Sequence, residues 1–133
     1  MDAAGLPLAY TTTPGNRNDV TQLVPLLDRV GPVRGRRGRP RCRPDIVYAD
    51  RGYDHDKYRR LLRARGIAHR IARRNTPNGF GLGRVRWVVE RTFAWLHAFK
   101  RLAICYERRA DPHEAFLAIG CSLICWRRLQ ESF

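Results

Sequence analysis

The sequence predicts an α/β domain, because short runs rich in β-branched residues alternate with longer segments whose apolar residues recur at helical spacing. Residues 46–49 and 67–72 have the length and composition of buried strands. Residues 84–101 and 112–130 have the length and periodicity of helices. The chain has 133 residues, 44% of them hydrophobic and 29% charged, which is the balance of one globular domain or of part of a larger one.

The N-terminal third is predicted to contain a strand, a helix and a loop. The strand covers residues 6–13. The helix covers residues 20–30, with Asp19 as its expected N-cap and with an apolar face formed by Leu23, Leu26, Leu27 and Val30. Residues 31–44 consist largely of Gly, Pro and Arg, which predicts a basic loop that contributes nothing to a packed core.

The middle of the chain is predicted to form a strand, a helix and a second strand. The first strand, at 46–49, ends at Asp50. A helix over residues 55–65 is expected to stop at Gly66, because glycine readily takes the left-handed conformation that ends helices. The second strand covers residues 67–72.

The C-terminal part is predicted to be mainly helical. A glycine-rich loop at 73–83 leads into a helix at 84–101, whose main apolar stripe consists of Val85, Val88, Leu96 and Phe99. Residues 102–109 are expected to be short and irregular, with a strand as the alternative. The last helix, at 112–130, is apolar nearly all round, which predicts burial in the domain or against a partner.

The charge balance predicts a polyanionic partner. Lys and Arg total 26 against 12 Asp and Glu, which gives a formal net charge of +14. Arginine dominates, and its planar fork fits phosphate with two hydrogen bonds. A GC-rich gene would explain why Arg replaces Lys, but it would not explain the excess of bases over acids. Nucleic acid is therefore the expected partner.

The cysteines and the apolar stretches indicate a reduced, cytoplasmic compartment. The sequence shows no signal peptide, and its longest apolar stretch, 115–126, is shorter than the roughly 20 residues needed to span a bilayer. The four cysteines, Cys42, Cys105, Cys121 and Cys125, lack the paired spacing of a zinc site. Cys121 and Cys125 are expected to be core thiols, one helical turn apart. We expect no membrane partner.

Asp50 is the first candidate for chemistry. It follows a buried strand, and in open α/β sheets ligands collect at the carboxyl ends of the strands. A carboxylate in this place could hold a divalent metal ion. The alternative is an aspartate that forms a turn before Gly52.

Glu90 is the second candidate. At 100° per residue it points away from the apolar stripe of its helix, and Trp87 and Phe93 flank it. Two flanking aromatics indicate a helix that is covered on more than one side, with a polar seam that faces a cleft. The alternative is an ordinary pair with Arg86, one turn away, worth a few tenths of a kcal/mol. Neither acid is decisive alone.

The sequence segments around the two acids are more specific than either acid alone. Residues 48–54 are Tyr-Ala-Asp-Arg-Gly-Tyr-Asp, and residues 86–96 are Arg-Trp-Val-Val-Glu-Arg-Thr-Phe-Ala-Trp-Leu. Arg101-Leu102 and Tyr106-Glu107-Arg108 follow. This order resembles insertion-sequence transposases of the DDE class, in the group named after insertion sequence five. The resemblance covers nearly the whole chain, from residues 5–8 to residues 126–129.

The resemblance implies a fold and a chemistry. The fold is ribonuclease H-like, a mixed sheet flanked by helices. Three acids, Asp, Asp and Glu, hold two Mg²⁺ ions, for which Mn²⁺ can substitute. Asp50 matches the second Asp and Glu90 matches the Glu, which makes both of them catalytic residues and metal ligands. The implied reaction is DNA transposition, in which water and then a freed 3′-hydroxyl attack a phosphodiester.

The resemblance also implies residues that contact DNA. Related families carry a Tyr–Arg–Glu–Lys signature around the Glu. Arg86 matches its Arg, whereas Gly83 and His97 occupy the Tyr and Lys positions, and Lys100 lies nearby. The candidates for phosphate contact in or beside the family motifs are Arg51, Arg86, Arg91 and Lys100. The basic loop and the glycine-rich loop themselves add Arg34, Arg36, Arg37, Arg39, Arg73, Arg74 and Arg84, for which a solvated, disordered loop is the alternative.

The N-terminus of the chain differs from the pattern of the family. The first Asp of the family lies upstream of the Gly-Leu-Pro-Leu segment, and only four residues precede Gly5. Asp2 is the one acid among them, and it does not sit in the expected motif. We therefore expect residues 1–133 to be a partial catalytic domain, truncated at its N-terminus, that needs the N-terminal portion of the transposase as a partner. The isolated chain is predicted not to cleave DNA.

Three interpretations follow. The chain is the second part of a split transposase, which acts as a multimer on transposon ends and target and associates with the nucleoid when DNA-bound. Alternatively, it is a basic DNA-binding remnant without catalysis that modulates an intact transposase. A third possibility is the unselected product of a decayed gene. Composition does not separate them.

Overall fold

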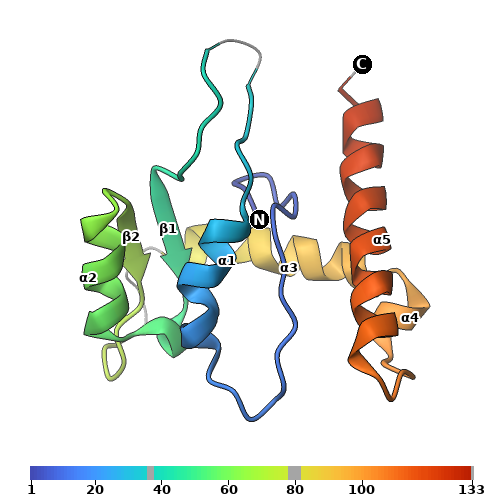
Figure 1. Cartoon of the computed structure of the whole chain (residues 1–133), viewed down its shortest axis with the longest axis horizontal. Coiled ribbons are helices and arrows are strands. Elements are labelled where there is room, and N and C mark those ends of the chain that lie inside the picture. The colour runs from blue at the N-terminus through green and yellow to red at the C-terminus, as the bar shows by residue number, and fades with distance from the viewer. Residues whose placement is uncertain (36–37, 78–81, 133) are drawn as a thin grey trace. The chain divides into compact units, whose positions relative to one another are not determined.

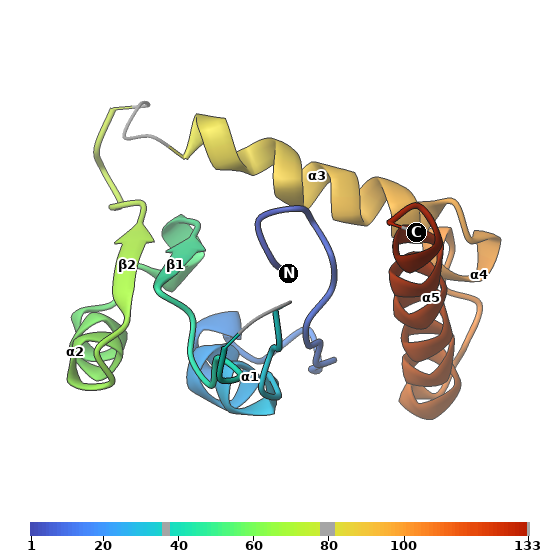
Figure 2. The same ribbon diagram turned by 90° about the horizontal axis from the view of Figure 1, so that it is seen from above.

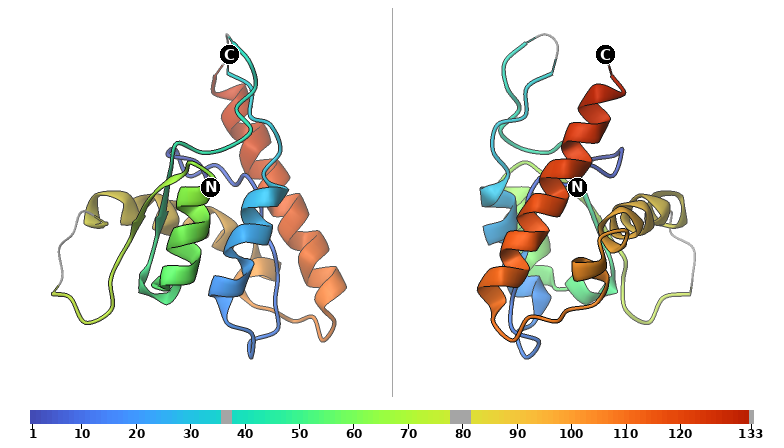
Figure 3. Two further views of the ribbon diagram at one scale, coloured as in Figure 1. Left: turned by 60° about the vertical axis from the view of Figure 1, so that its left-hand side comes forward. Right: turned by 90° about the vertical axis from the view of Figure 1, so that its right-hand side faces the viewer.

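The structure is a computed structural model that describes residues 1–35, 38–77 and 82–132. Figures 1, 2 and 3 show its helices and strands. The chain divides into two compact units. We call Thr13–Val85 the sheet unit, and Met1–Thr12 together with Arg86–Phe133 the helical unit. Each is described by itself.

The sheet unit is built on two parallel strands. Strand β1 (Ile46–Ala49) pairs with β2 (Ala68–Ile71), with Ile46 opposite Ala68 and Ala49 opposite Ile71. Helix α2 (Asp56–Ala64) joins them and lies beside β2 (Figure 1). Parallel strands need such a crossover. Both predicted strands and the helix between them are confirmed. In the described residues the sheet has two strands, where a mixed sheet was expected.

The core of the sheet unit forms where α1 (Leu23–Arg29), α2 and β2 meet. Its buried members are Leu23, Leu62, Ile67 and Ile71, and Leu62 is fully buried. Leu27, Val47, Ala49, Tyr53 and Tyr58 pack against them.

The predicted helix at 20–30 exists, but it begins differently. A 3-10 helix, η1 (Asp19–Gln22), precedes α1. Pro25 gives the reason: its ring excludes an α-helical hydrogen bond to the carbonyl of Thr21, and proline fits only the first turn of a helix. Asp19 is not the cap. The side chain of Asn18 accepts the hydrogen bond from the N–H of Val20.

Helix α2 ends as its sequence predicts. Gly66 has a φ of +67°, and the N–H of Ile67 donates to the carbonyl of Leu62 at 2.9 Å. The N–H of Gly66 donates to Arg63, which completes a Schellman motif. Before α2, a short 3-10 helix, η2 (Arg51–Tyr53), follows β1; the sequence did not predict it.

The helical unit contains α4 (Lys100–Ala103), α5 (Ala110–Gln130) and all but the first three residues of α3 (Gly83–His97). Figure 3 shows the long α5 and the short α4. The prediction of one continuous helix at 84–101 is wrong, because the chain turns at Phe99. The turn lets Leu102 join Leu96 and Phe99 around Gly120 of α5. A Cβ at Gly120 would lie 2.8 Å from Leu102 Cδ1.

The predicted strand at residues 6–13 is wrong. The described residues offer it no partner strand, and the segment is irregular. Contacts to α3 and α5 hold it instead: Thr92 Oγ1 donates to the carbonyl of Gly5 at 2.6 Å, and Cys125 Sγ to that of Pro7 at 3.8 Å. The strand alternative for 102–109 is also wrong, since this segment leaves α4 and runs irregularly to Arg109.

The burial predicted for the last helix is only partly confirmed. Its buried residues are Gly120, Cys121 and Ile124. The opposite face is apolar yet exposed, and its members are Ile119, Leu123, Trp126 and Leu129. Cys125 is exposed as well, so only Cys121 is the expected core thiol. No helix in the described part of the chain is long and apolar enough to cross a membrane.

Candidate active site

Asp50 lies at the carboxyl end of β1, as predicted. Its side chain is exposed, and Oδ1 accepts a hydrogen bond from the N–H of Gly52 at 2.9 Å. This bond caps η2, so the turn-forming role that the sequence left open is present. Because a carboxylate offers two oxygens and about four lone-pair sites, the cap leaves capacity for a further ligand.

An ion pair just after Asp50 organises this end of the sheet. Arg59 of α2 is buried, and its Nη2 donates to Asp54 Oδ1 at 2.6 Å and to the carbonyl of Ile71 at 3.0 Å. The N–H of Arg74 donates to Asp54 Oδ2 at 2.7 Å. Asp54 and Arg59 therefore tie the segment after β1 to the end of β2.

Two exposed arginines strengthen the same connection. Arg74 Nε donates to the carbonyl of Arg51 at 3.2 Å, and Arg51 Nη2 donates to the carbonyl of Thr76 at 3.1 Å. The loops that leave the two strands are thus bonded to each other. Asp50 lies at the start of this segment, so the hydrogen bonds between the two loops help to position its carboxylate.

The hydrogen bonds to Asp54 also favour its charged form. The backbone N–H of Arg74, and then the side chain of Arg59, hold the pKa of the Asp54 carboxyl below its usual value. The carboxylate is therefore ionised whenever the protein is near neutral pH, and its bonds are intact.

Glu90 lies on the exposed side of α3. Arg86 Nε donates to Glu90 Oε1 at 2.9 Å, with the two side chains 79% and 63% exposed. This is the ordinary pair that the sequence left open. Such an exposed pair contributes only about 0.3–0.5 kcal/mol, so it would yield readily to a stronger ligand of the carboxylate.

The opposite face of α3 fixes the direction of Glu90. Val88 and Thr92, each two residues away, are buried at 5% and 3% exposure. Thr92 Oγ1 also contacts Gly5, whose φ is +85° and whose hypothetical Cβ would lie 3.1 Å from that oxygen. Anchored on this side, α3 presents Glu90 outward. The flanking Trp87 and Phe93 are 44% and 51% exposed, so the covered helix expected from them is not seen.

The two acids belong to different units, Asp50 to the sheet unit and Glu90 to the helical unit. Both are exposed carboxylates, and hard oxygen donors of this kind suit Mg²⁺. Among the described residues there is no group of three or more His, Cys, Asp or Glu that could hold a metal ion.

The predicted phosphate-contacting residues differ in their surroundings. Arg34, Arg39, Arg73 and Lys100 are exposed, and Arg51 and Arg74 donate to backbone carbonyls. Arg36 and Arg37 lie outside the described residues, as does the side chain of Arg84. The sheet unit holds 18 Lys and Arg against 6 Asp and Glu, whereas the helical unit holds 8 against 6. The positive charge is therefore concentrated in the sheet unit.

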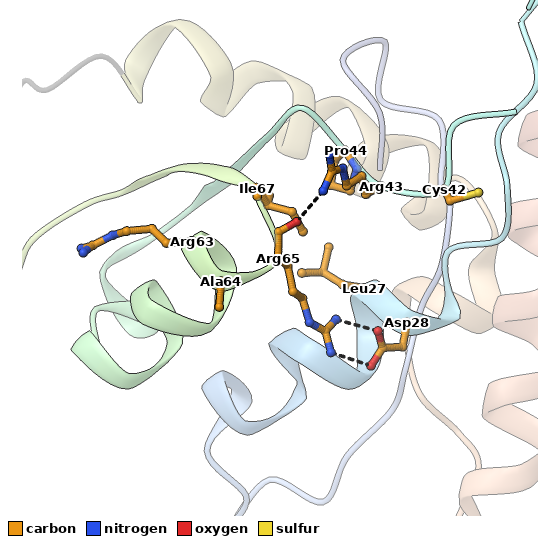
Figure 4. A pocket seen from close by; sticks show the side chains of 10 residues that line it. Leu27, Asp28, Cys42, Arg43, Pro44, Arg63, Ala64, Arg65 and Ile67 are labelled. Atoms are coloured by element: carbon orange, nitrogen blue, oxygen red, sulfur yellow. Dashed lines mark hydrogen bonds and ion pairs between the residues drawn. The ribbon is translucent and has the colours of Figure 1, made fainter. Parts of the chain in front are cut away.

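An open pocket of about 610 Å³ lies elsewhere in the sheet unit (Figure 4). Arg65 Nη1 pairs with Asp28 at 2.6 Å, and Arg43 Nη1 donates to the carbonyl of Arg65 at 2.9 Å. These bonds join the basic loop and α1 to the end of α2. Arg43 and Arg65 thus bind protein partners, and a third arginine of the lining, Arg63, is exposed.

A family model for the transposase DDE domain matches residues 1–125. The chain belongs to this family. It is also 60% identical over 131 residues to the "putative transposase for insertion sequence element IS402" of Burkholderia cepacia. That match covers 98% of this chain and 62% of the relative, so the chain spans under two thirds of the relative's length. No solved structure matches.

Sequence reasoning missed the pair of Asp54 and Arg59. Asp54 stands in the segment 48–54 that carries the family resemblance, and this was the available signal. Its partner Arg59 lies five residues later and could not be distinguished from the exposed Lys57, Arg60 and Arg63 on the same helix. Burial alone separates them.

Proposed function

We propose that this chain is part of the catalytic core of a transposase that cleaves DNA at the ends of an insertion sequence and joins them to target DNA. Family membership supports the reaction class. The observation that carries the proposal is the placement of Asp50: its carboxylate stands exposed at the carboxyl end of a parallel strand, on a segment held by the bonds of Asp54 and Arg74.

Asp50 and Glu90 are the residues that we propose to hold Mg²⁺, or Mn²⁺ in its place. When bound, the metal supplies activation of the attacking oxygen and stabilisation of the leaving one. Asp50 contributes a carboxylate whose orientation Gly52 fixes, and Glu90 contributes one that Arg86 can release. After that release the Arg86 guanidinium is free to bind a phosphate beside the scissile bond.

The two strands would then be part of a larger, ribonuclease H-like mixed sheet. The relative is longer than this chain, and its remaining 38% is unmatched. We propose that an N-terminal portion of the transposase supplies further strands and the first catalytic Asp. Transposition pairs two DNA ends, so the assembly would hold more than one copy of the chain.

The second candidate is a DNA-binding protein without catalysis that modulates an intact transposase. The excess of 18 basic over 6 acidic residues in the sheet unit favours it, because phosphate contacts alone suffice for non-specific binding. It differs from the first candidate in requiring neither Asp50 nor Glu90.

A cleavage assay separates the two candidates. The 133-residue chain, and the same chain fused to the N-terminal portion of the Burkholderia relative, are incubated with end-containing DNA and Mg²⁺ or Mn²⁺. We expect nicking by the fusion alone. Asp50→Asn and Glu90→Gln should each abolish it, whereas Asp56→Asn, an exposed acid in the first turn of α2, should not.

The possible outcomes are distinct. DNA binding without metal-dependent nicking by the fusion would overturn the first candidate in favour of the second. Nicking by the isolated chain that Asp50→Asn abolishes would retain the reaction but overturn the need for an N-terminal portion.

A further inference from the structure

A stack of alternating arginine and tryptophan side chains runs along α3 and reaches α5. Trp87, Arg91 and Trp95 follow one another at four-residue intervals on one face of α3. The guanidinium of Arg91 lies 4.3 Å from the ring centre of Trp87 and 5.7 Å from that of Trp95. Arg128 of α5 lies 5.0 Å from Trp95. All four residues belong to the helical unit.

Packing between helices explains the position of one of the two tryptophans but not that of the other. Trp95 is half-buried between two guanidinium groups, and through Arg128 it links α3 to α5. Trp87 stands at the end of the stack, and the ring contact that the described residues give it is with Arg91 of its own helix. A link between helices therefore accounts for Trp95 but not for Trp87.

Trp87 has an exposed ring face, and its contact with Arg91 favours one orientation of the ring. The residue is 44% exposed, and Arg91 covers one face of the ring. The exposed area therefore lies on the other face and at the edges. Because Arg91 contacts the rings of both Trp87 and Trp95, the stack favours one orientation of Trp87 before any ligand arrives, which lowers the entropic cost of binding.

The position of Trp87 relative to Glu90 indicates the ligand. The two residues are three apart on α3, a spacing that places their Cβ atoms about 5–6 Å apart. If Glu90 holds a metal at the scissile phosphate, a neighbouring nucleotide comes within reach of the Trp87 ring. The exposed Arg86 and the partly exposed Arg91 flank the ring with positive charge, which complements a DNA backbone.

We propose that Trp87 is a stacking platform for an unpaired DNA base next to the phosphate that is cut. The proposal rests on the proposed function, because it uses Glu90 as the marker of the reacting phosphate. An aromatic face accepts any base, whereas a paired base in a duplex keeps its faces covered by its neighbours. The platform would therefore favour DNA ends whose terminal bases are unpaired.

The test compares two labelled duplexes of equal sequence, one fully paired and one with three unpaired terminal nucleotides, by fluorescence anisotropy with the 133-residue chain. Trp87→Ala should weaken binding of the unpaired-end DNA by about 5- to 150-fold and leave binding of the paired duplex unchanged. Trp87→Phe should retain most of the affinity. Trp126→Ala, which removes the exposed tryptophan of α5, is the control and should change neither.

Equal effects of Trp87→Ala and Trp126→Ala, or an equal loss on both DNAs, would overturn the proposal while leaving DNA binding intact. Failure of the wild-type chain to bind either duplex would overturn the DNA binding of the proposed function together with it. A second measurement needs no variant. A fluorescent 2-aminopurine at the unpaired position should be quenched on binding to the wild-type chain, and an unchanged signal would contradict stacking.

Discussion

At the scale of single residues, the segment after β1 depends on a carboxylate that does no chemistry. Asp54 receives Arg59 and the N–H of Arg74, and Arg59 has only 9% of its side chain exposed. A buried guanidinium that loses its partner keeps the cost of desolvation without the compensating attraction. The segment that carries Asp50 should therefore be more stable when the Asp54 carboxylate is ionised than when it is neutral.

Asp54→Asn should lower the free energy of unfolding at pH 7, and Asp56→Asn, on the exposed start of α2, should not. The pKa of Asp54 is lowered in the folded protein, so its contribution is present above the unfolded-state value of about 4 and is lost as the pH falls through the folded value. Urea unfolding at pH 7 and pH 3 measures this. A difference between wild type and Asp54→Asn that does not become smaller from pH 7 to pH 3 would argue against the charge.

His69 of β2 should make stability fall at mildly acidic pH. Burial, and then the charges of Arg59 and Arg63, lower the pKa of its imidazole. Below about pH 6.5 His69 is protonated in the unfolded chain but is still neutral in the folded protein. The free energy of unfolding therefore decreases as the pH falls through that range. NMR titration should place the pKa of His69 below the unfolded-state value of about 6.5, and His69→Gln should remove the step. A His69 that titrates at or above 6.5 would contradict this.

Among single residues, the sequence predicted those whose structural role depends only on residues next to them in the chain. Asp50 as the end of a strand and Gly66 as the end of a helix follow from neighbouring residues alone. The pair of Asp54 and Arg59 could not be predicted, because its strength depends on the carbonyl of Ile71 and on the N–H of Arg74, which β2 brings near.

At the scale of elements, errors arose where tertiary contacts decide. The segment 6–13 has a strand pattern, but a strand needs a partner, and contacts from Thr92 and Cys125 fix the segment instead. The stripe at 84–101 is periodic enough for one helix, yet packing around Gly120 favours a turn at Phe99. The strands and α2 were predictable because their patterns and stop signals agree.

Gly120→Val should destabilise the helical unit by about 1–3 kcal/mol through overpacking, since its side chain would collide with Leu102 and press on Leu96. Ala115→Val, at an exposed position of the same helix, introduces valine without the collision and is the control. Because valine is a weaker helix former than alanine but a stronger one than glycine, helix propensity alone would make Ala115→Val the more destabilising change. Thermal unfolding of both variants measures the difference. Adding Leu102→Ala should restore part of the loss, and equal effects of the two valine variants would contradict the packing.

At the scale of the whole molecule, charge is unevenly divided between the two units, and DNA affinity should depend on it. Arg34→Ala with Arg39→Ala should reduce the slope of log K against log salt concentration by about 1.8, or roughly 0.9 for each phosphate that is no longer neutralised. Arg109→Ala, exposed in the helical unit and paired with Asp111, should leave the slope unchanged. Binding of duplex DNA between about 50 and about 200 mM salt measures this; an equal change in both variants would contradict it.

The shared metal site that we propose for Asp50 and Glu90 follows from neither local sequence pattern nor local packing. Each acid taken alone has an ordinary role in its own unit, as the cap of η2 and as the partner of Arg86. The resemblance of segments 48–54 and 86–96 to one family joined them. The pairing therefore needs a measurement that reports on both acids at once.

Binding of Mn²⁺ by electron paramagnetic resonance, in a double-mutant cycle on the chain fused to the N-terminal portion of the Burkholderia relative, is that measurement. Asp50→Asn and Glu90→Gln should each weaken binding by at least about tenfold, because even the outer hydrogen-bond partners of metal ligands are worth about 10- to 100-fold. If the two acids share an ion, both single substitutions should weaken the same binding event, and the double variant should bind at least as weakly as the weaker single variant. Single variants that each lose one Mn²⁺ ion while binding another with wild-type affinity, or affinities that neither substitution changes, would contradict the shared site.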